Sequence, residues 1–306
     1  MKSLSRRHHY IPQSYLAAFT DTKKKTGSLH VFDIIRKKKF KTSPVNIALE
    51  RDFNKIEIDA CPIDALENKL SEFEGNIISS LNAVNATLKF PDSEQLNDIL
   101  NLLCLLAVRN PKTRDQFNHF RRQSHDMLSD LLVQNKKIYQ NAIISARRRG
   151  FIKDSDRDIE YEEMLGFIKN RRYKIEIPTQ ANIVVEFSLF DKILQLLGER
   201  HWSILISSCF CPEFICSDHP VTLVSKNQQH YYGYGSRNTE IFFPIGPRIC
   251  LYGTFEDPLK YTVYPNAKKV ASINNVIADN ARSCIYSSRE TFYILTQGSI
   301  TQIAQI

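Results

Sequence analysis

The spacing of apolar residues changes near Arg200, and this change constrains the fold more than any other feature of the chain. Before Arg200, apolar residues recur every three or four positions, which is typical of helices that bury one face. After it, short β-prone runs follow one another through turn residues, which is typical of strands with short connections. Strands joined in this way pair antiparallel. We therefore predict an α+β fold in which a helical layer packs against a mostly antiparallel C-terminal sheet.

A single domain is expected over residues 1–306, in three successive parts. Residues 1–60 hold an N-terminal arm and a β-hairpin over 28–41, residues 61–200 hold the helices, and residues 201–306 hold most of the strands. Helices are expected from Pro62 through Leu81, from Ser93 to the residues before Pro111, from Lys112 without a break to Ala146, and over 158–169, 182–197 and 272–282. Strands are expected at 55–59, 202–208, 214–217, 221–224, 240–243, 249–252, 285–286 and 292–296.

The composition describes a folded, basic chain. Lys and Arg number 41 against 33 Asp and Glu, which gives a net charge of +8 and a pI near 9.0. This balance suits a polyanionic partner such as nucleic acid but does not require one. No apolar run approaches the roughly 20 residues of a membrane span, and no apolar segment follows the basic N-terminus. We expect a cytoplasmic protein without a membrane partner; the composition does not set its oligomeric state.

Motifs of several large enzyme classes are absent. The sequence has no G-x-G-x-x-G, Walker A, H-E-x-x-H or G-x-S-x-G motif, and only 10 glycines. These absences disfavour a dehydrogenase, a P-loop NTPase and an α/β-hydrolase.

The seven cysteines suit buried structure better than disulfides or zinc. Their number is odd and no secretion signal precedes them, which argues against a disulfide framework. Cys209, Cys211 and Cys216 fall within eight residues, with His219 as a fourth candidate ligand, but this spacing matches no common zinc pattern. We expect small apolar residues in buried strands.

An unusual segment near the N-terminus places two histidines side by side. Because His8 and His9 are adjacent, they point in different directions, and one can face inward while the other stays accessible. Tyr15, Leu16 and Phe19 have helical spacing and are expected to anchor this arm to the core. Histidine serves as base, acid or metal ligand near neutral pH. The alternative is a frayed basic terminus followed by an amphipathic helix.

Two further positions have both a structural and a functional interpretation. Asp218 and His219 follow a strand, where Asp218 can orient an imidazole or simply close a turn before Pro220. Arg109 ends a helix, where a cation stabilises the helix dipole or presents a bidentate fork to a phosphate. Basic runs and the tyrosines of the 226–239 loop add a weaker signal for nucleic-acid binding, with stacking expected from Tyr231, Tyr232 and Tyr234.

Several of these motifs together resemble the DUF4238 family, a group of bacterial and phage-associated proteins without an assigned activity. The resemblance is carried by R-R-H-H-Y-I-P-Q-S-Y-L-A-A-F from Arg6 to Phe19, and by Glu50–Phe53, Arg109–Pro111, Trp202, Ser217–Val221, Pro244–Pro247 and Asn275…Ala281-Arg282…Tyr286. Some members are associated with antiphage defence, which implies a toxic or nucleic-acid-directed effector. The resemblance also implies that these distant motifs converge on one pocket, which favours the functional interpretation of Asp218 over the turn.

The leading hypothesis is a nuclease-like effector that cleaves RNA or DNA. Its candidate catalytic residues are His8, His9, Asp218 and Glu50. Its candidate phosphate-binding residues are Arg109, Arg282 and Arg7. A divalent metal is a candidate cofactor, with His9, Asp218 and His219 as candidate ligands. The alternatives are a non-catalytic module that senses a phage protein or nucleic acid, and an enzyme that acts on a small phosphorylated metabolite.

Overall fold

The structure, a computed structural model, describes residues 6–56, 65–153, 155–227, 231–257 and 260–304. These ranges contain eight α-helices and thirteen strands, so the α+β prediction is confirmed. The chain divides into two compact units. The first consists of Met1–Thr113 together with Thr179–Ile306, and the second consists of Arg114–Pro178.

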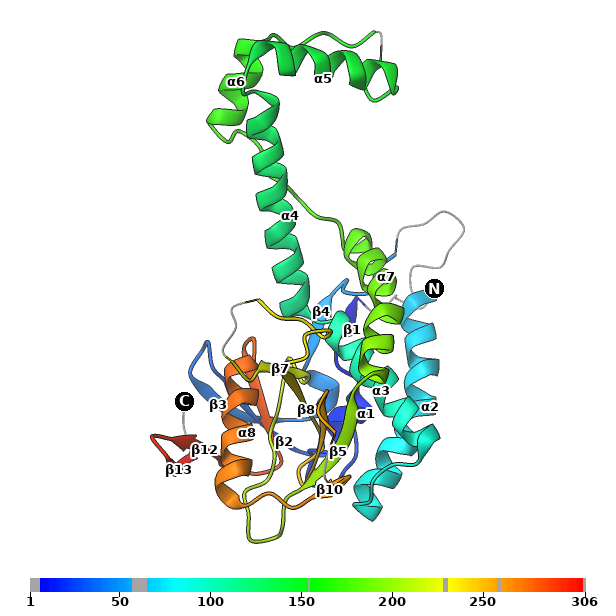
Figure 1. Cartoon of the computed structure of the whole chain (residues 1–306), viewed down its shortest axis with the longest axis vertical. Coiled ribbons are helices and arrows are strands. Elements are labelled where there is room, and N and C mark those ends of the chain that lie inside the picture. The colour runs from blue at the N-terminus through cyan, green and yellow to red at the C-terminus, as the bar shows by residue number, and fades with distance from the viewer. Residues whose placement is uncertain (1–5, 57–64, 154, 228–230, 258–259, 305–306) are drawn as a thin grey trace. The chain divides into compact units, whose positions relative to one another are not determined.

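The first unit contains a five-stranded sheet in the order β10-β5-β9-β8-β7 (Figure 1). Neighbouring strands are antiparallel except β10 and β5, which are parallel. The short strand β10 is one that the sequence pattern missed. The five strands are β5 (His201–Ile206), β7 (Thr222–Ser225), β8 (Thr239–Gly246), β9 (Ile249–Thr254) and β10 (Thr262–Val263).

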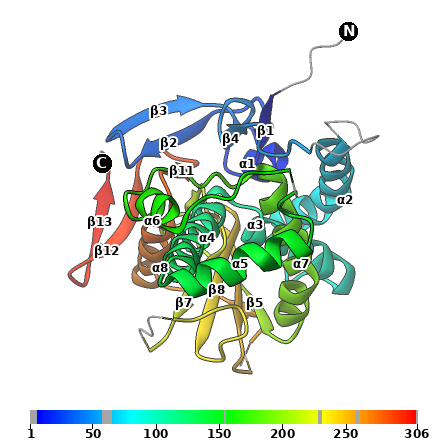
Figure 2. The ribbon, with the colours of Figure 1, turned by 90° about the horizontal axis from the view of Figure 1, so that it is seen from above.

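A second sheet, in the order β3-β2-β11-β6, joins the two ends of the chain. The predicted hairpin supplies β2 and β3, and β11 pairs antiparallel with β2 so that His30 lies opposite Ser287 (Figure 2). Two-stranded sheets form from β1 with β4 and from β12 with β13, and of these four strands only β12 was predicted. The strands are β1 (Arg7–His9), β2 (Leu29–Asp33), β3 (Lys38–Thr42), β4 (Leu49–Arg51), β6 (Cys216–Ser217), β11 (Cys284–Ser287), β12 (Phe292–Thr296) and β13 (Ser299–Ile303).

Helix α3 (Ser93–Val108) lies in the core of the first unit, as its almost continuous apolar sequence predicts. Asp92 caps the start of this helix: its carboxylate accepts the Gln95 amide at 2.9 Å, and the Gln95 side chain accepts the Asp92 amide in return. Helices α2 and α7 pack against α3. The other helices of this unit are α1 (Gln13–Ala17), α2 (Ala65–Thr87), α7 (Thr179–Gly198), α8 (Ala267–Asn280) and a 3-10 turn at Pro44–Asn46.

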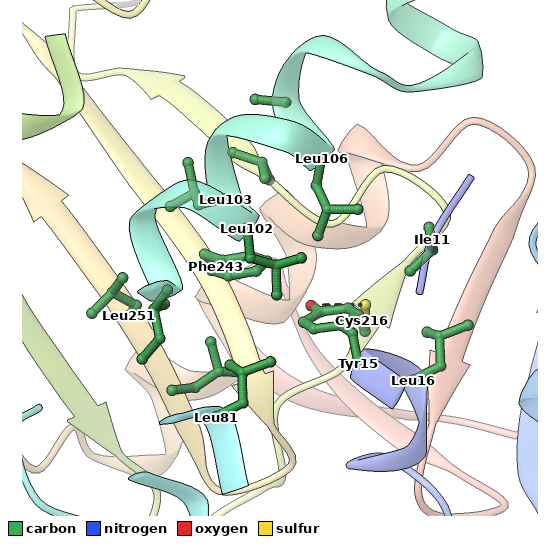
Figure 3. Packing of buried hydrophobic residues seen from close by; sticks show 14 of the residues in the cluster. Ile11, Tyr15, Leu16, Leu81, Leu102, Leu103, Leu106, Cys216, Phe243 and Leu251 are labelled. Atoms are coloured by element: carbon green, nitrogen blue, oxygen red, sulfur yellow. Dashed lines mark hydrogen bonds between the residues drawn. The ribbon is translucent and has the colours of Figure 1, made fainter. Parts of the chain in front are cut away.

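The N-terminal arm is fixed to this core by an aromatic side chain. Tyr15 stacks on Phe243 with ring centroids 5.4 Å apart, and its hydroxyl donates to the Pro244 carbonyl at 2.5 Å beside the Cys216 thiol (Figure 3). Leu16 and Phe19 are fully buried with it. The prediction that these side chains anchor the arm is therefore confirmed.

The second unit consists of α4 (Pro111–Leu132), which begins in the first unit, α5 (Lys136–Arg148) and α6 (Tyr161–Lys169). The prediction of one helix from Lys112 to Ala146 is wrong. The chain leaves the helix after Leu132, and the Asn135 side chain starts α5 by accepting the Ile138 amide at 3.0 Å. An Asn at this position is a strong N-cap, and it ends the continuity that the apolar spacing suggested.

Some predictions fall on residues that the structure does not describe. The helix start at Pro62–Asp64 lies outside the described residues, as does most of the strand over 55–59, and residues 55–56 are not in a strand. Cys216 and Cys250 are buried in strands, as expected, whereas Cys209 is exposed in a loop. None of the described helices combines the length and apolar character needed to cross a membrane.

Candidate functional site

The candidate site is built on the two-stranded ribbon formed by β1 and β4. The register places His8 opposite Glu50, and Arg7 opposite Arg51. Because side chains alternate along a strand, His8 faces inward and is 4% exposed, whereas Arg7 lies on the exposed side. The structure thus identifies His8 as the inward member of the pair and separates Arg7 from it.

His8 is held by the chain segment that follows β4. Its Nδ1 accepts the backbone amide of Asn54 at 2.8 Å. A neutral imidazole that accepts at Nδ1 carries its proton on Nε2, so the ring offers a donor at that nitrogen. This arrangement suits His8 as a hydrogen-bond donor more than as a general base or a metal ligand, the roles expected from the sequence.

His9 is held on both of its ring nitrogens. Nε2 lies 3.2 Å from the Val45 carbonyl oxygen, and Nδ1 lies 3.3 Å from the Gln13 amide nitrogen. Only a carbonyl acceptor is present at Nε2, so that nitrogen carries the proton and Nδ1 accepts. Burial lowers the pKa of His9, with the Val45 bond opposing the shift. The neutral ring of His9 thus links the N-terminal arm to the 3-10 turn through hydrogen bonds.

Arg109 turns away from its own helix end and enters the arm. It is 2% exposed, donates to Asn54 Oδ1 at 2.5 Å and to the His9 carbonyl at 3.3 Å, and its guanidinium lies 5.3 Å from the centre of the Phe53 ring. Asn54 in turn donates to the Glu67 carboxylate. Arg109 therefore joins α3, the ribbon and α2, which neither the helix-dipole nor the phosphate interpretation anticipated.

The charge of Arg109 also affects the pKa of a second carboxylate on α2, that of Glu74. Burial raises the pKa of Glu74 to about 7, and the positive charge of Arg109 limits that rise. Asn54, Glu67 and Glu74 were not singled out by the sequence. The only signal available was the seven-residue spacing of the two glutamates, which places them on one face of α2.

Asp218 is 1% exposed, and its carboxylate is occupied by one loop. Oδ1 accepts the amide of Arg282 at 2.7 Å. Oδ2 accepts the amide of Ser283 at 2.8 Å, its hydroxyl at 2.6 Å, and the amide of Cys284 at 2.9 Å. The carboxylate therefore accepts four hydrogen bonds from this loop, three on Oδ2 and one on Oδ1. Asp218 thus organises residues 282–284, in the manner of the turn alternative, although the loop it holds is distant in sequence.

The loop held by Asp218, residues 282–284, places Arg282 beside the β1–β4 ribbon. The Arg282 guanidinium donates to Glu50 Oε1 at 2.7 Å, and the two side chains are 36% and 38% exposed. Asn110, which follows Arg109, donates to the Asp218 carbonyl at 2.8 Å. A chain of contacts therefore brings His8, Glu50, Arg109, Asp218 and Arg282 together, and of the charged groups Glu50 and Arg282 are the ones that solvent reaches.

His219 takes part in a separate cluster. Its Nδ1 is 2.7 Å from the Asn280 amide nitrogen, and Lys112 donates to the Asn280 carbonyl at 2.8 Å. Among the residues the structure describes, no group of three His, Cys, Asp or Glu side chains is placed to hold a metal ion. The expected ligand set of His9, Asp218 and His219 is therefore not assembled.

We expect His219 to make the fold sensitive to mild acid. Burial, with Lys112 adding to it, lowers the pKa of His219 to about 4. Between pH 6.5 and pH 4 the unfolded chain binds a proton that the folded chain does not, so stability falls as the pH falls. The expected loss is about 3 kcal/mol across that interval. Denaturant unfolding at pH 7, 5.5 and 4 measures it, and a His219→Gln variant with the same pH dependence as the wild type would contradict the assignment.

The remaining expected residues lie elsewhere. Tyr231 is 95% exposed, but Tyr234 packs against the hydrophobic core and is not free to stack on a base. A cavity of about 480 Å³ in the first unit holds none of the expected site residues; its charged lining is Asp21, Lys23, Glu213, Arg248 and Arg289.

Comparison with known proteins gives a family and nothing more specific. No curated protein and no solved structure matches the chain. The family model described as "Protein of unknown function (DUF4238)" matches residues 7–291, a span that contains the β1–β4 ribbon, Arg109, Asp218 and Arg282. The chain therefore belongs to the DUF4238 family.

Proposed function

We propose that this protein is a nucleic-acid-directed effector that cleaves phosphodiester bonds, with Glu50 and Arg282 as its reacting pair. The observation that carries the proposal is their 2.7 Å contact at the surface of an otherwise buried polar network. An accessible carboxylate beside an accessible guanidinium supplies a proton acceptor and a phosphate ligand at one point. The net charge of +8 favours approach by a polyanion.

The proposed chemistry uses the two groups in sequence. The phosphate displaces Glu50 from Arg282, which then binds the non-bridging oxygens and neutralises charge in the transition state. Glu50 takes the proton of the nucleophile, which is the 2′-hydroxyl in RNA or a water molecule in DNA. The new P–O bond forms as the bond to the leaving oxygen breaks, and solvent protonates that oxygen. Asp218 and His8 are positioning residues, since one fixes the Arg282 backbone and the other lies opposite Glu50.

The test is cleavage of tRNA, total RNA and plasmid by the purified protein, with Mn²⁺ and with EDTA. We expect Glu50→Gln to lower the rate by at least about a hundredfold, because the amide cannot accept the proton. Glu290→Gln is the matched control, since Glu290 also pairs with a cation, Lys39 of the hairpin, at 3.0 Å but lies between β11 and β12 rather than on the β1–β4 ribbon. Absence of cleavage under all conditions, or equal rates for the two variants, would overturn the proposal.

A binding module without catalysis is the second candidate, and the exposed tyrosines favour it. Tyr231 and Tyr232 are 95% and 43% exposed, and such rings stack on unpaired bases. Binding of single-stranded RNA that falls steeply with salt and yields no product supports this candidate. For either candidate we also propose a cytoplasmic location and a part in antiphage defence. Protection of phage-challenged cells that Glu50→Gln abolishes, at unchanged protein level, supports the catalytic form.

A further inference from the structure

The cavity of about 480 Å³ in the first unit has no part in the function proposed above. Its volume falls within the range of small-molecule binding sites. Its walls come from the loop after α1, the end of α2, the turn between β8 and β9, and the residues before β6 and after β11. The motif Pro244–Pro247, which the Glu50–Arg282 pair does not use, ends at a residue of this lining.

Close packing fixes two walls of the cavity. On one side, the Asn85 side chain donates to the Ile245 carbonyl at 2.7 Å, and its Oδ1 would lie 1.9 Å from a Cβ at Gly246. On the other, the Thr20 hydroxyl accepts the Lys24 amide at 3.1 Å and so closes the loop after α1. A site whose walls are already ordered binds a ligand without the cost of ordering them.

The two carboxylates of the lining already have donors. Glu213 Oε1 accepts the Arg289 guanidinium at 3.2 and 3.3 Å, and its Oε2 accepts the Ser288 hydroxyl. Asp21 Oδ1 accepts the Ser28 amide at 2.7 Å. Glu213 and Arg289 therefore neutralise each other, and the remaining charges of the lining are those of Asp21 and two cations.

Those two cations are Arg248 and Lys23. Arg248 Nε donates to the Ser207 carbonyl at 3.0 Å, and the Arg248 carbonyl accepts the Ser207 amide at 2.9 Å. These bonds position the guanidinium, whose two terminal nitrogens have no acceptor among the residues that the structure describes. Lys23 has a φ of 55°, in the left-handed region, and its ammonium forms no ion pair with a described residue. The lining thus keeps a net positive charge.

We propose that this cavity binds a small organic anion, which Arg248 and Lys23 hold by its phosphate or carboxylate group. The terminal nitrogens of a guanidinium form a planar fork that matches two oxygens of either group. The Lys23 ammonium adds a second positive charge for the same anion. Ala18, Leu88 and Pro247 supply apolar lining, which suits a ligand with an apolar body.

Isothermal titration calorimetry on the full-length protein tests the ligand class. The probes are phenyl phosphate, benzoate and benzamide, which share one ring and differ in the attached group. We expect at least one of the two anions to bind and benzamide not to bind, because the amide lacks the charge that the two cations recognise. Binding of phenyl phosphate alone identifies a phosphate ligand, and binding of benzoate alone a carboxylate. Failure of both anions at millimolar concentration, or equal binding of benzamide, overturns the proposal.

Two variants locate the bound anion. Arg248→Gln should weaken binding at least about tenfold, because it removes the charged donor pair. Lys23→Gln should also weaken binding, and it provides the test if Arg248→Gln does not fold. Arg149→Gln is the matched control, since Arg149 is exposed at the end of α5 and lies outside the cavity.

The variants also separate this site from the Glu50–Arg282 pair. If Arg248→Gln binds the anion as the wild type does, the anion lies elsewhere on the protein and the proposal fails. If Arg149→Gln weakens binding equally, the effect comes from overall charge and the proposal also fails. Calorimetry needs no cleavage, so a protein without nuclease activity can still bind the anion.

Discussion

Replacement of Asp218 by alanine is expected to lower the free energy of unfolding by about 4 kcal/mol. The carboxylate accepts three backbone amides and one hydroxyl between 2.6 and 2.9 Å, and it is 1% exposed. Alanine leaves these donors without an acceptor in a buried site, and each such loss costs about 1–3 kcal/mol without being additive. Urea denaturation followed by circular dichroism measures the change.

Two further variants keep this prediction sharp. Asp279→Ala removes an exposed carboxylate from α8 and should change stability by less than about 0.5 kcal/mol. Asp218→Asn keeps the shape but turns an amide nitrogen toward the donors of the 282–284 loop, and it should lose at least half as much as alanine. If Asp218→Ala does not fold, Asp218→Asn still provides the test. Loss of less than 1 kcal/mol in both Asp218 variants would contradict the role assigned to this carboxylate.

Replacement of Arg109 by methionine is expected to cost a similar amount, about 3–5 kcal/mol. Methionine fills much of the buried space, but it leaves Asn54 Oδ1 and the His9 carbonyl without their donor. It also removes the cation that favours ionised Glu74, whose pKa of about 7 already lies above the usual 4.5. A raised folded-state pKa means that stability is lost as the pH rises through it. The variant should therefore lose more stability at pH 8 than at pH 5.

The matched control for this variant is Arg157→Met in the second unit. Arg157 pairs with Glu163 at 3.1 Å on the surface, with both side chains more than half exposed. Such pairs contribute at most about 1 kcal/mol. Unfolding measured at both pH values distinguishes the two sites. If Arg109→Met lost the same stability at both pH values, Glu74 would not be coupled to Arg109. If it lost as little stability as Arg157→Met, the contacts of Arg109 would not stabilise the fold.

Much of the fold could be predicted because local signals agree with tertiary packing. The apolar run of α3, its end before Pro111 and the hairpin over 28–41 all combine periodicity with a terminating residue. The break after Leu132 was missed because apolar residues continue at helical spacing on both sides of it, and a single Asn cap outweighs that pattern. Strands β10 and β13 carry weak signals of their own and depend on partners already in place.

The sequence motifs pointed to four charged residues of the contact network, but not to Asn54, Glu67 or Glu74 and not to the contacts themselves. The motifs led to Glu50, Arg109, Asp218 and Arg282, and the structure connects all of them. The partner of each group could not be inferred, since Arg282 and Glu50 are 232 residues apart in sequence and meet only through the Asp218 loop. Asp218 is an example. Its sequence neighbourhood fits a catalytic carboxylate and a structural one equally well, and only the positions of the donors around the carboxylate distinguish the two roles.

The pairing of β2 with β11 has a consequence for how the protein is made. His30 and Ser287 are register partners, so the second edge of β2 stays open until residue 287 has left the ribosome. At about 5–20 residues per second, the intervening 250 or so residues take roughly 12–50 s to synthesise. An open strand edge in a nascent chain invites pairing with other chains. The same delay applies to Arg282, which follows Glu50 by 232 residues, so a product truncated before residue 282 lacks the Glu50–Arg282 contact.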